Sequence, residues 1–291
     1  MNNRAVEMKD VRKAFGEFCL RIDDLSLDRG YVLGLVGQNG AGKSTTIKML
    51  LNLVYPDRGT ISVLGLRQPK DEIEIRRRVG YLSETPAFYE EMTAGWIAGL
   101  VKRYYPNWDD RLYAHYLDKF NLDPNRKVKE FSRGMKVKFG LTLALSHRPE
   151  LLILDEPTSG IDPVIRRELL EEIAGIIKDE DRTVIFSSHI TQDVEQVADY
   201  VAILDQGTVV EYSDREDLFD RWKKVTGTAT SPHSIRDSFV AFKCDTYGFT
   251  GITNRFSPDW LEELNSRGAT DLKVSNLRLD EILISLARRE F

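Results

Sequence analysis

Cysteine is scarce in this sequence. Among 291 residues there are 2 cysteines, Cys19 and Cys244, which lie far apart in the chain. They belong to no C-x-x-C or Cys/His spacing, so the sequence predicts neither a disulfide framework nor a structural zinc site. We expect a protein of a reducing compartment in which neither cysteine is a metal ligand or a nucleophile.

Long hydrophobic runs are missing as well. A helix needs about 20 consecutive apolar residues to cross a bilayer, whereas the hydrophobic residues of this chain, 42% of the total, stand in short runs. The first residues, MNNRAVE, contain no apolar signal region. If a membrane matters for the function, we expect another chain to supply the spanning part.

An excess of positive charge is the third absence. The chain has 41 Lys and Arg against 46 Asp and Glu, a formal net charge of -5, so it lacks the electropositive character of a dedicated nucleic-acid binder. Its charged content of 30% is that of an ordinary soluble globular protein. The length allows one large domain and a smaller one.

The strongest positive signal is Gly37–Ser44, GQNGAGKS, which fits G-x-x-x-x-G-K-[ST] at every fixed position. An apolar, β-rich run at 31–36 precedes it and a helical pattern at 45–53 follows, which is the context that this pattern requires. Its glycines allow backbone N–H groups to cradle phosphate oxygens at a helix N-terminus. We expect Lys43 to reach the β and γ phosphates and Ser44 to bind Mg²⁺.

Upstream of this loop, short apolar runs at 6–8, 18–22 and 25–27 predict strands, mostly antiparallel. Phe15, which precedes Gly16, is expected on a loop from which it could stack on an adenine ring. An aromatic residue beside a glycine is more often a packing residue, so both interpretations stay open.

Residues 79–84 read as a buried strand that ends in Glu84, a residue able to touch a metal or its water. The segment 85–145 then changes to helical periodicity with many aromatic residues and predicts an inserted helical subdomain. Most of its aromatics are expected in the core and a minority in a docking groove for another protein.

Within that segment Phe131–Met135, FSRGM, opens a helix that runs to residue 145. The densest positive cluster of the chain surrounds it, formed by Arg126, Lys127, Lys129, Arg133, Lys136 and Lys138. Two interpretations stay open: a solvated helix surface, or a second helix N-terminus that faces phosphate.

The run 151–156, LLILDE, predicts a buried parallel strand with two carboxylates at its C-terminal end, where open α/β sheets bind ligands. Asp155 is expected to hold the hydration shell of Mg²⁺, and Glu156 to orient the water that attacks the γ-phosphate. The next buried strand, 183–187, leads to His189. This histidine is either structural or a hydrogen-bond donor to the γ-phosphate.

The last part of the sequence contains no motif that we can connect to chemistry. Residues 226–233, TGTATSPH, have the composition of a linker. Strands are predicted over 239–244, 249–253 and 271–275, with a helix from 259 to about 268 and a closing helix over 279–289. Together they predict a small α+β appendage.

In this order the elements resemble the ATP-binding subunit of an ABC transporter, over about residues 4–212. The resemblance implies an α/β fold with a RecA-like P-loop NTPase core, a mainly parallel sheet, an antiparallel β subdomain and an inserted helical subdomain at about 85–145. It implies an ATP-binding domain over 1–215, and the residue patterns beyond it predict a small C-terminal α+β domain over 226–291.

The resemblance also implies a role for each motif. Phe15 matches the family's adenine-stacking aromatic, residues 151–156 its Walker B strand and His189 its switch histidine. The implied ATP-binding residues are Phe15, Gly37, Gln38, Asn39, Gly40, Ala41, Gly42, Lys43, Ser44, Thr45 and Glu84. The implied catalytic residues are Lys43, Glu156 and His189, the metal ligands Ser44, Glu84 and Asp155, and the D-loop residues Ser159, Gly160 and Asp162.

Two motifs depart from the family pattern. Phe131–Met135 stands where the family has Leu-Ser-Gly-Gly-Gln, and it keeps the serine and the second glycine. Glu84 takes the place of the Q-loop glutamine. Because two such ATPase subunits close head to tail, the signature residues Ser132, Arg133, Gly134 and Met135 are expected to complete a site on the other subunit, and the basic cluster to face its triphosphate.

The function implied is that of an ATPase subunit that uses ATP and Mg²⁺ to power export, similar to bacterial antibiotic-resistance and sodium-efflux ATPases. Expected partners are transmembrane permease subunits and a second ATP-binding subunit, either identical or a paralogue, at the inner, cytoplasmic face of the cell membrane. The alternative is a soluble ABC-type ATPase that acts on ribosomes or DNA. Such relatives usually have tandem ATPase domains or long coiled-coil arms, and this sequence has one such domain without sustained heptads.

Overall fold

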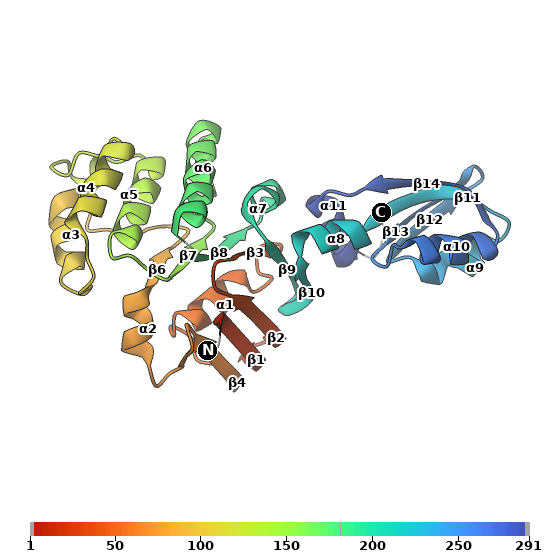
Figure 1. The fold of residues 1–291 in the computed structure, drawn as a ribbon, viewed down its shortest axis with the longest axis horizontal. Helices are drawn as coiled ribbons and strands as arrows, with labels where there is room; N and C mark the ends of the chain where they lie inside the picture. The colour runs from red at the N-terminus through yellow and green to blue at the C-terminus, as the bar shows by residue number, and fades with distance from the viewer. Residues whose placement is uncertain (1–2, 181, 289–291) are drawn as a thin grey trace. The chain divides into compact units, whose positions relative to one another are not determined.

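The computed structural model describes residues 3–180 and 182–288, and the chain folds into two compact units, Met1–Val209 and Val210–Phe291 (Figure 1). The predicted domain limits at 215 and 226 stay a prediction. The structure contains one ten-stranded and one four-stranded sheet.

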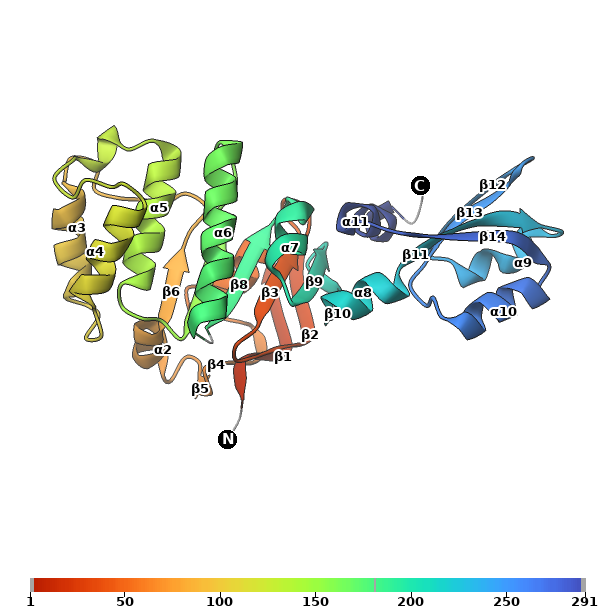
Figure 2. The ribbon, with the colours of Figure 1, turned by 45° about the horizontal axis from the view of Figure 1, so that its top comes forward.

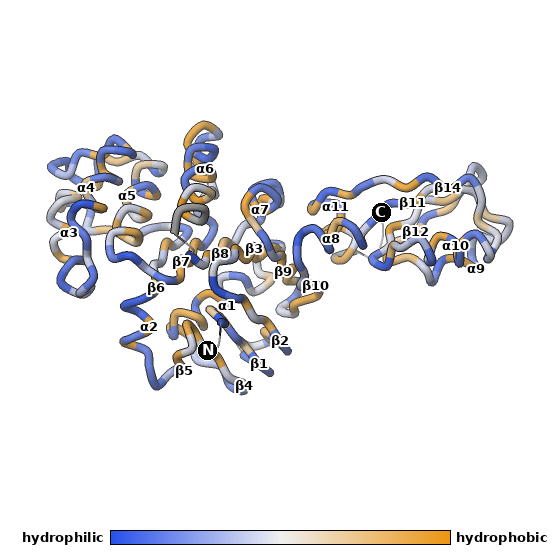
Figure 3. Tube along the Cα trace, in the orientation of Figure 1, coloured by the Kyte–Doolittle hydropathy of each residue, from blue (hydrophilic) through white to orange (hydrophobic). Residues whose placement is uncertain are grey.

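A parallel sheet forms the centre of the first unit. Its strands, in spatial order, are β9 (Tyr200–Asp205), β3 (Val32–Val36), β8 (Thr183–Ser188), β7 (Leu151–Asp155) and β6 (Val79–Leu82). Every residue of β3, β7 and β8 is buried, as expected for parallel strands covered on both faces, and these strands are largely hydrophobic in Figure 3. Their C-terminal ends therefore meet at one edge of the sheet.

Beyond β9 the sheet continues to β10 (Thr208–Asp214), whose Thr208 pairs in parallel with Arg21 of β2 (Phe18–Asp28). The limit between the two units falls within β10. Antiparallel pairing then joins β2 to β1 (Arg4–Phe15), β4 (Arg58–Val63) and β5 (Leu66–Arg67). The predicted short strands at 18–22 and 25–27 are in fact one strand. Polar Asp23 and Asp24 lie between them and remain in β2 because β1 pairs along its length, with Lys9 opposite Asp24. Phe15 is the last residue of β1, so the expectation that it lies on a loop was wrong.

Helices α1 (Lys43–Leu50), α2 (Glu72–Arg78), α6 (Pro163–Glu180) and α7 (Thr191–Val197) accompany these strands. Helix α7 packs tightly on β3, because a Cβ on Gly34 would lie 2.2 Å from Val194 Cγ1.

The helical subdomain predicted at about 85–145 is present. It contains α3 (Ala94–Lys102), α4 (Asp110–Lys119), a short 3-10 helix (Val128–Glu130) and α5 (Arg133–Leu145), which lie together in Figures 1 and 2. The side chains of Thr93 and Asp109 cap α3 and α4. Phe131 and Phe139 are buried, whereas Trp96 is 50% and Tyr104 70% exposed, so only some of the aromatics belong to the core.

The second unit is a four-stranded antiparallel sheet with the order β12 (Ala241–Asp245), β13 (Gly248–Thr253), β11 (Lys223–Ala229) and β14 (Ala269–Asn276). Helix α9 (Pro232–Ile235) and the 3-10 helix Arg236–Ser238 follow β11, and α10 (Pro258–Ser266) follows β13. This β-α-β-β-α-β order is that of the ferredoxin-like fold. Helices α8 (Arg215–Arg221) and α11 (Leu279–Arg288) flank it in the sequence.

The interpretation of 226–233 as a linker was wrong. Residues 226–229 belong to the interior strand β11, and Pro232 begins α9. β-branched threonines suit a pleated strand, and Gly227 fits because a Cβ there would lie 2.7 Å from the Thr270 carbonyl oxygen. The predicted helix at 279–289 matches α11 up to Arg288, and residue 289 lies outside the described residues.

Candidate nucleotide-binding site

The loop Gly37–Ser44 joins β3 to α1 as the sequence predicts. Gly42 precedes the helix with φ 112°, a conformation that favours glycine. A Cβ on Gly37 would lie 2.4 Å from the carbonyl oxygen of Leu204. The ammonium group of Lys43 donates to the carbonyl oxygens of Gly37 and Gln38 at 2.7 and 3.3 Å. The loop is thus held in its curved shape by its own lysine.

Asp155 ends β7 beneath this loop. Its Oδ1 accepts hydrogen bonds from Ser187 Oγ at 2.7 Å and from Ser44 Oγ at 3.3 Å, and the residue is 4% exposed. Burial, and to a smaller degree the charge of Asp155, raises the pKa of Tyr81 on β6 to about 12. The hydroxyl and carboxylate predicted to bind magnesium are therefore adjacent, although they come from different strand–helix units.

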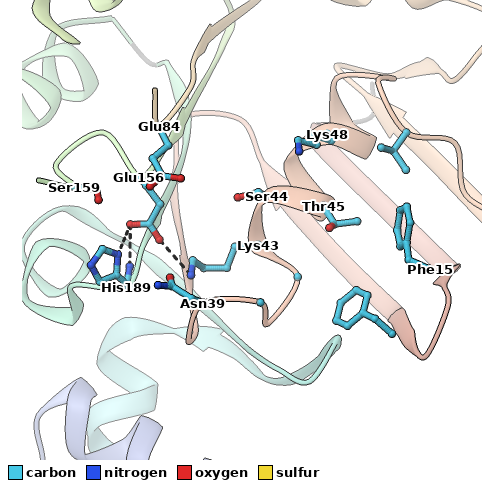
Figure 4. A pocket seen from close by; sticks show the side chains of 14 residues that line it. Phe15, Asn39, Lys43, Ser44, Thr45, Lys48, Glu84, Glu156, Ser159 and His189 are labelled. Carbon is cyan, nitrogen blue, oxygen red and sulfur yellow. Dashed lines mark hydrogen bonds and ion pairs between the residues drawn. The ribbon is translucent and has the colours of Figure 1, made fainter. Parts of the chain in front are cut away.

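Glu156 connects the phosphate loop to the histidine (Figure 4). Its Oε2 lies 2.7 Å from His189 Nδ1 and accepts the backbone N–H of His189 at 3.2 Å. Its Oε1 lies 3.2 Å from Lys43 Nζ, an ion pair without hydrogen-bond geometry, and accepts no hydrogen bond among the described residues. Glu156 is 5% exposed, and its Oε1 is thus an acceptor available to a ligand.

A cavity of about 710 Å³ opens beside these groups. Predicted site residues that line it are Phe15, Asn39, Gly40, Gly42, Lys43, Ser44, Thr45, Glu84, Glu156, Ser159 and His189. Phe15 stands at the opposite side of the cavity from His189 (Figure 4), and it is 46% exposed with Lys13 Nζ 5.6 Å from its ring centre. The arrangement offers an aromatic surface at one end and charged groups at the other.

Gly37, Gln38, Ala41 and Asp155 do not line the cavity. Gly37 and Gln38 contribute the carbonyl oxygens that hold Lys43, and Ala41 and Asp155 are buried. These four residues therefore support the loop without lining the cavity.

Sequence reasoning missed three lining residues, Phe18, Lys48 and Val54. Phe18 pairs with Phe15 across the β1–β2 turn. The signal in the sequence was that only Gly16 and Glu17 separate the two phenylalanines. Lys48 lies on the helix that follows the loop. Val54 follows α1 in an irregular segment, and no feature of the sequence distinguished it.

The signature segment lies outside this cavity. Ser132 caps α5 by accepting the N–H of Met135 at 3.2 Å. Gly134 is buried, and a Cβ there would lie 2.8 Å from Ile165 Cδ1. The guanidinium of Arg133 lies against the D-loop, because a Cβ on Gly160 would be 2.6 Å from its Nη1. Asp162 accepts the N–H of Val164 at 2.8 Å and so caps α6.

Most of the basic cluster around α5 is neutralised within the chain. The ion pairs are Arg126–Glu130, Lys127–Glu91, Lys129–Glu91, Lys136–Glu90 and Lys138–Glu168. Arg133 is the member that has no carboxylate partner among the described residues. Of the two interpretations left open, the solvated, ion-paired surface describes most of the cluster.

Comparison with known proteins places this geometry in a family. The family model described as "ABC transporter" matches residues 20–159. The bacitracin transport ATP-binding protein BcrA of Bacillus licheniformis is 38% identical over 75% of this chain and 71% of its own length. The linearmycin resistance ATP-binding protein LnrL of Bacillus subtilis is 33% identical over 81% and 77%, and the lantibiotic transport ATP-binding protein SrtF of Streptococcus pyogenes 33% over 73% and 93%.

Solved structures agree with this placement. A structure described as the ATP-binding subunit of an ABC transporter is 32% identical, with a TM-score of 0.66, and the match covers 74% of this chain and 91% of that one. The ATP-binding cassette MJ0796, bound to ADP and phosphate, has the same fold with a TM-score of 0.63 at 19% identity, covering 72% and 98%. The chain therefore belongs to the ATP-binding subunits of ABC transporters, and it is an ATPase of that family.

Proposed function

We propose that this subunit hydrolyses ATP to power the export of an antibiotic or a peptide through separate membrane subunits. The observation that carries the proposal is the contact of buried Lys43 and Glu156 with exposed His189 beside the 710 Å³ cavity. The cargo class is suggested by relatives whose names refer to bacitracin, linearmycin and lantibiotic transport or resistance.

In this proposal the nucleotide lies along the cavity, with its adenine on Phe15 and its phosphates on the loop N–H groups. Lys43 binds the β and γ phosphates. Glu156, through its available Oε1, orients the attacking water, and His189 donates a hydrogen bond to the γ-phosphate. Glu84, two residues beyond the end of β6, faces the same water or metal.

The residues present fit a magnesium ion. Mg²⁺ takes oxygen ligands and is held in phosphate sites by one or two protein groups together with phosphates and water. Ser44 Oγ and Asp155 Oδ1, 3.3 Å apart, supply such groups, and no larger cluster of metal-binding side chains occurs among residues 3–180 and 182–288. When bound, the ion would neutralise charge on the β and γ phosphates.

We further propose that two subunits close head to tail, so that Ser132 and Gly134 of one face the phosphate loop of the other. Ser132 is exposed at the N-terminus of α5, where the helix dipole is positive. Arg133, without a carboxylate partner in the described part of the chain, can turn from Gly160 toward that phosphate.

The membrane subunit is proposed to dock beside α3. A groove of about 520 Å³ lies between α2 and α3 and is lined by Ile73, Arg76, Arg77, Leu100, Val101, Tyr104 and Tyr105. Ile73 is 71% and Tyr104 70% exposed, an apolar patch typical of an interface. No helix among the described residues has the length and apolar character of a membrane span. Docking would hold the subunit at the cytoplasmic face of the cell membrane.

A capture experiment tests this function. The tagged full chain is purified from detergent-solubilised membranes, and its partners are identified by mass spectrometry. We expect multispanning proteins, and we expect Tyr104→Asp to remove them while ATP binding is kept. Tyr247→Asp is the matched control, because Tyr247 is 91% exposed but lies in the second unit. Capture of ribosomal RNA or DNA instead of membrane proteins would contradict the proposal.

A further inference from the structure

One face of the sheet in the second unit is open in part: Lys243 and Lys273 on it are exposed, whereas Ala241 and Ile252 on the same face are buried. The core of the unit lies on the opposite face, where Val225, Ile235, Phe249, Trp260, Leu264 and Ala269 pack together from β11, α9, β13, α10 and β14. Because successive side chains of a strand point to opposite faces, the neighbours of Val225 and Phe249 point to the other face. Thr226 and Thr250 therefore occupy that face.

One row of side chains crosses all four strands there. Lys243 on β12 is opposite Thr250 on β13, Thr250 is opposite Thr226 on β11, and Thr226 is opposite Lys273 on β14. Neighbouring strands lie about 4.8 Å apart, so the Cα atoms of the two lysines are about 14 Å apart. This lysine–threonine row lines a hollow of about 420 Å³.

The hollow has local causes. Gly248 lines the hollow in the next row toward the strand ends, and a Cβ there would lie 2.4 Å from the carbonyl oxygen of Gly227. The register of β11 and β14 shifts between Thr226 and Thr228, and Asp271 in this irregularity has φ 54°. Such bulges redirect a side chain, and Asp271 lines the hollow.

The two lysines of the row differ from the two carboxylates of the hollow in their contacts within the chain. Both lysines are exposed, and the described residues offer neither of them an ion-pair partner. Asp245 accepts the N–H groups of Tyr247 and Gly248 at 2.8 and 3.2 Å. Asp271 accepts Thr228 Oγ1 at 3.1 Å. The hollow therefore presents two ammonium groups without an ion-pair partner, two threonine hydroxyls between them, and two hydrogen-bonded carboxylates in the same lining.

We propose that the lysine–threonine row binds the phosphoryl group of a small phosphorylated molecule. Lysine binds phosphate as a point charge, and a threonine hydroxyl donates to a phosphate oxygen. The long lysine side chains reach inward from both ends of the row, so that all four groups can contact one phosphoryl group above β11 and β13. Asp245 and Asp271 at the rim suit hydroxyl or amino groups of the same molecule.

Other occupants fit less well. Single-stranded nucleic acid binds open sheets by stacking its bases on several aromatic residues, whereas the central positions of this row are threonines and the exposed aromatic in the lining is Tyr247. A second copy of the same face would bring lysines toward lysines, and like charges across an interface oppose association. A further explanation is that Lys243 and Lys273 only protect the two edge strands from pairing with other sheets.

Methyl NMR of the full chain separates these explanations. With threonine methyl groups labelled, inorganic pyrophosphate is titrated into the protein. We expect saturable shifts of the Thr226 and Thr250 methyls. Thr45 and Thr46, beside the phosphate loop, report on the nucleotide site in the same spectra. Failure of the nucleotide site and failure of the proposed site would therefore be seen separately.

The double variant Lys243→Ala/Lys273→Ala is expected to weaken pyrophosphate binding at Thr226 and Thr250 by at least about tenfold, since it removes two charged donors. Lys223→Ala is the control, because Lys223 is on the same sheet and already donates to Asn276 at 2.8 Å.

Unchanged binding in the double variant, or no shift of Thr226 and Thr250 in the parent protein, overturns the proposal. The proposal also fails if these methyls respond only to vesicles of phosphatidylcholine and phosphatidylglycerol and not to pyrophosphate. Vesicle binding alone would assign the row to a membrane surface.

Discussion

The phosphate loop of the first unit and the lysine–threonine row of the second present two ways to receive a phosphate. The loop uses the contiguous residues Gly37–Ser44 at a helix N-terminus, and its lysine is 5% exposed and already bonded within the chain. The row collects residues from four strands, and its lysines are exposed and unpaired in the described structure. The loop is preorganised and buried, whereas the row depends on side chains that a ligand has to order.

This difference has an energetic meaning. A buried charge is costly to leave without a partner, so changes at the loop should have large effects. Exposed charges are screened by water and salt, and each contributes less. The predictions below test this contrast, in order of decreasing effect.

The largest effect is expected from Glu156→Gln. If this carboxylate orients the attacking water, the amide should lower ATP turnover about 10³-fold, while nucleotide binding is retained. Phosphate release measures turnover, and nucleotide titration measures binding. Glu168→Gln is the control, because Glu168 pairs with Lys138 at the surface. Turnover at the parent rate in Glu156→Gln would refute the assigned role of Glu156. It would also remove the largest expected difference between the buried loop site and the exposed row.

Lys43→Ala should lower nucleotide affinity about 100-fold, or about 3 kcal/mol, because it removes the cation expected at the β and γ phosphates. Calorimetric titration with ADP measures this. Lys48 lines the same cavity but is exposed, so Lys48→Ala should lower nucleotide affinity much less. Equal losses in the two variants would mean that burial does not distinguish them. A melting curve checks that Glu156, left without its cation, has not unfolded the variant.

The cost of a buried polar group can also be measured away from both sites, at His147. It is 2% exposed, its ring stacks on Tyr105, and its Nδ1 has no hydrogen-bond partner among the described atoms. Burial lowers the pKa of His147 from 6.5 to about 4. Its stabilising contribution is therefore complete above pH 6.5 and is lost as the pH falls toward 4, because the unfolded chain binds the proton first.

Urea unfolding gives the measurement. From about pH 7.5 to about pH 5, the free energy of unfolding of the parent should fall by about 2 kcal/mol more than that of His147→Leu. Parallel pH profiles would show that His147 is protonated as easily in the folded chain as in the unfolded one. In that case burial alone would not explain strong effects at the phosphate loop.

The smallest effect is expected from Thr250→Val in the row. The substitution removes one hydroxyl, keeps the β-branched shape and should weaken pyrophosphate binding about fivefold, the effect of one hydrogen bond of about 1 kcal/mol. The Thr226 methyl reports the titration. Thr230→Val, at an exposed residue outside the row, is the control. A loss as large as that of Lys43→Ala would mean that the row is as preorganised as the loop.

The sequence predicted the loop and its surroundings well because the necessary residues are adjacent. Glycines, Lys43 and Ser44 stand in one pattern, and apolar runs ending in Asp155–Glu156 and His189 mark strands that end at the same edge. Val54 was missed because its place in the cavity depends on tertiary packing, whereas the place of Phe18 follows from its pairing with Phe15.

The second unit shows features that residues adjacent in the sequence cannot predict. β11 has a polar composition that also suits a linker, and only its pairing with β13 and β14 makes it a strand. The lysine–threonine row exists because of the register of four strands, and the irregularity at Asp271 shifts that register. Residue pattern alone placed strands near 239–244 and 271–275 but could not align Lys243 with Lys273.

The ion pair between Lys43 and Glu156 has a consequence for the order of events. Lys43 Nζ and Glu156 Oε1 lie 3.2 Å apart and each residue is 5% exposed, so on the proposed roles the phosphate-binding cation and the catalytic carboxylate contact each other. A triphosphate that binds would compete with Glu156 for Lys43. The lysine–phosphate contact would then free the carboxylate that orients the attacking water. ATP binding would therefore itself activate the carboxylate needed for ATP hydrolysis.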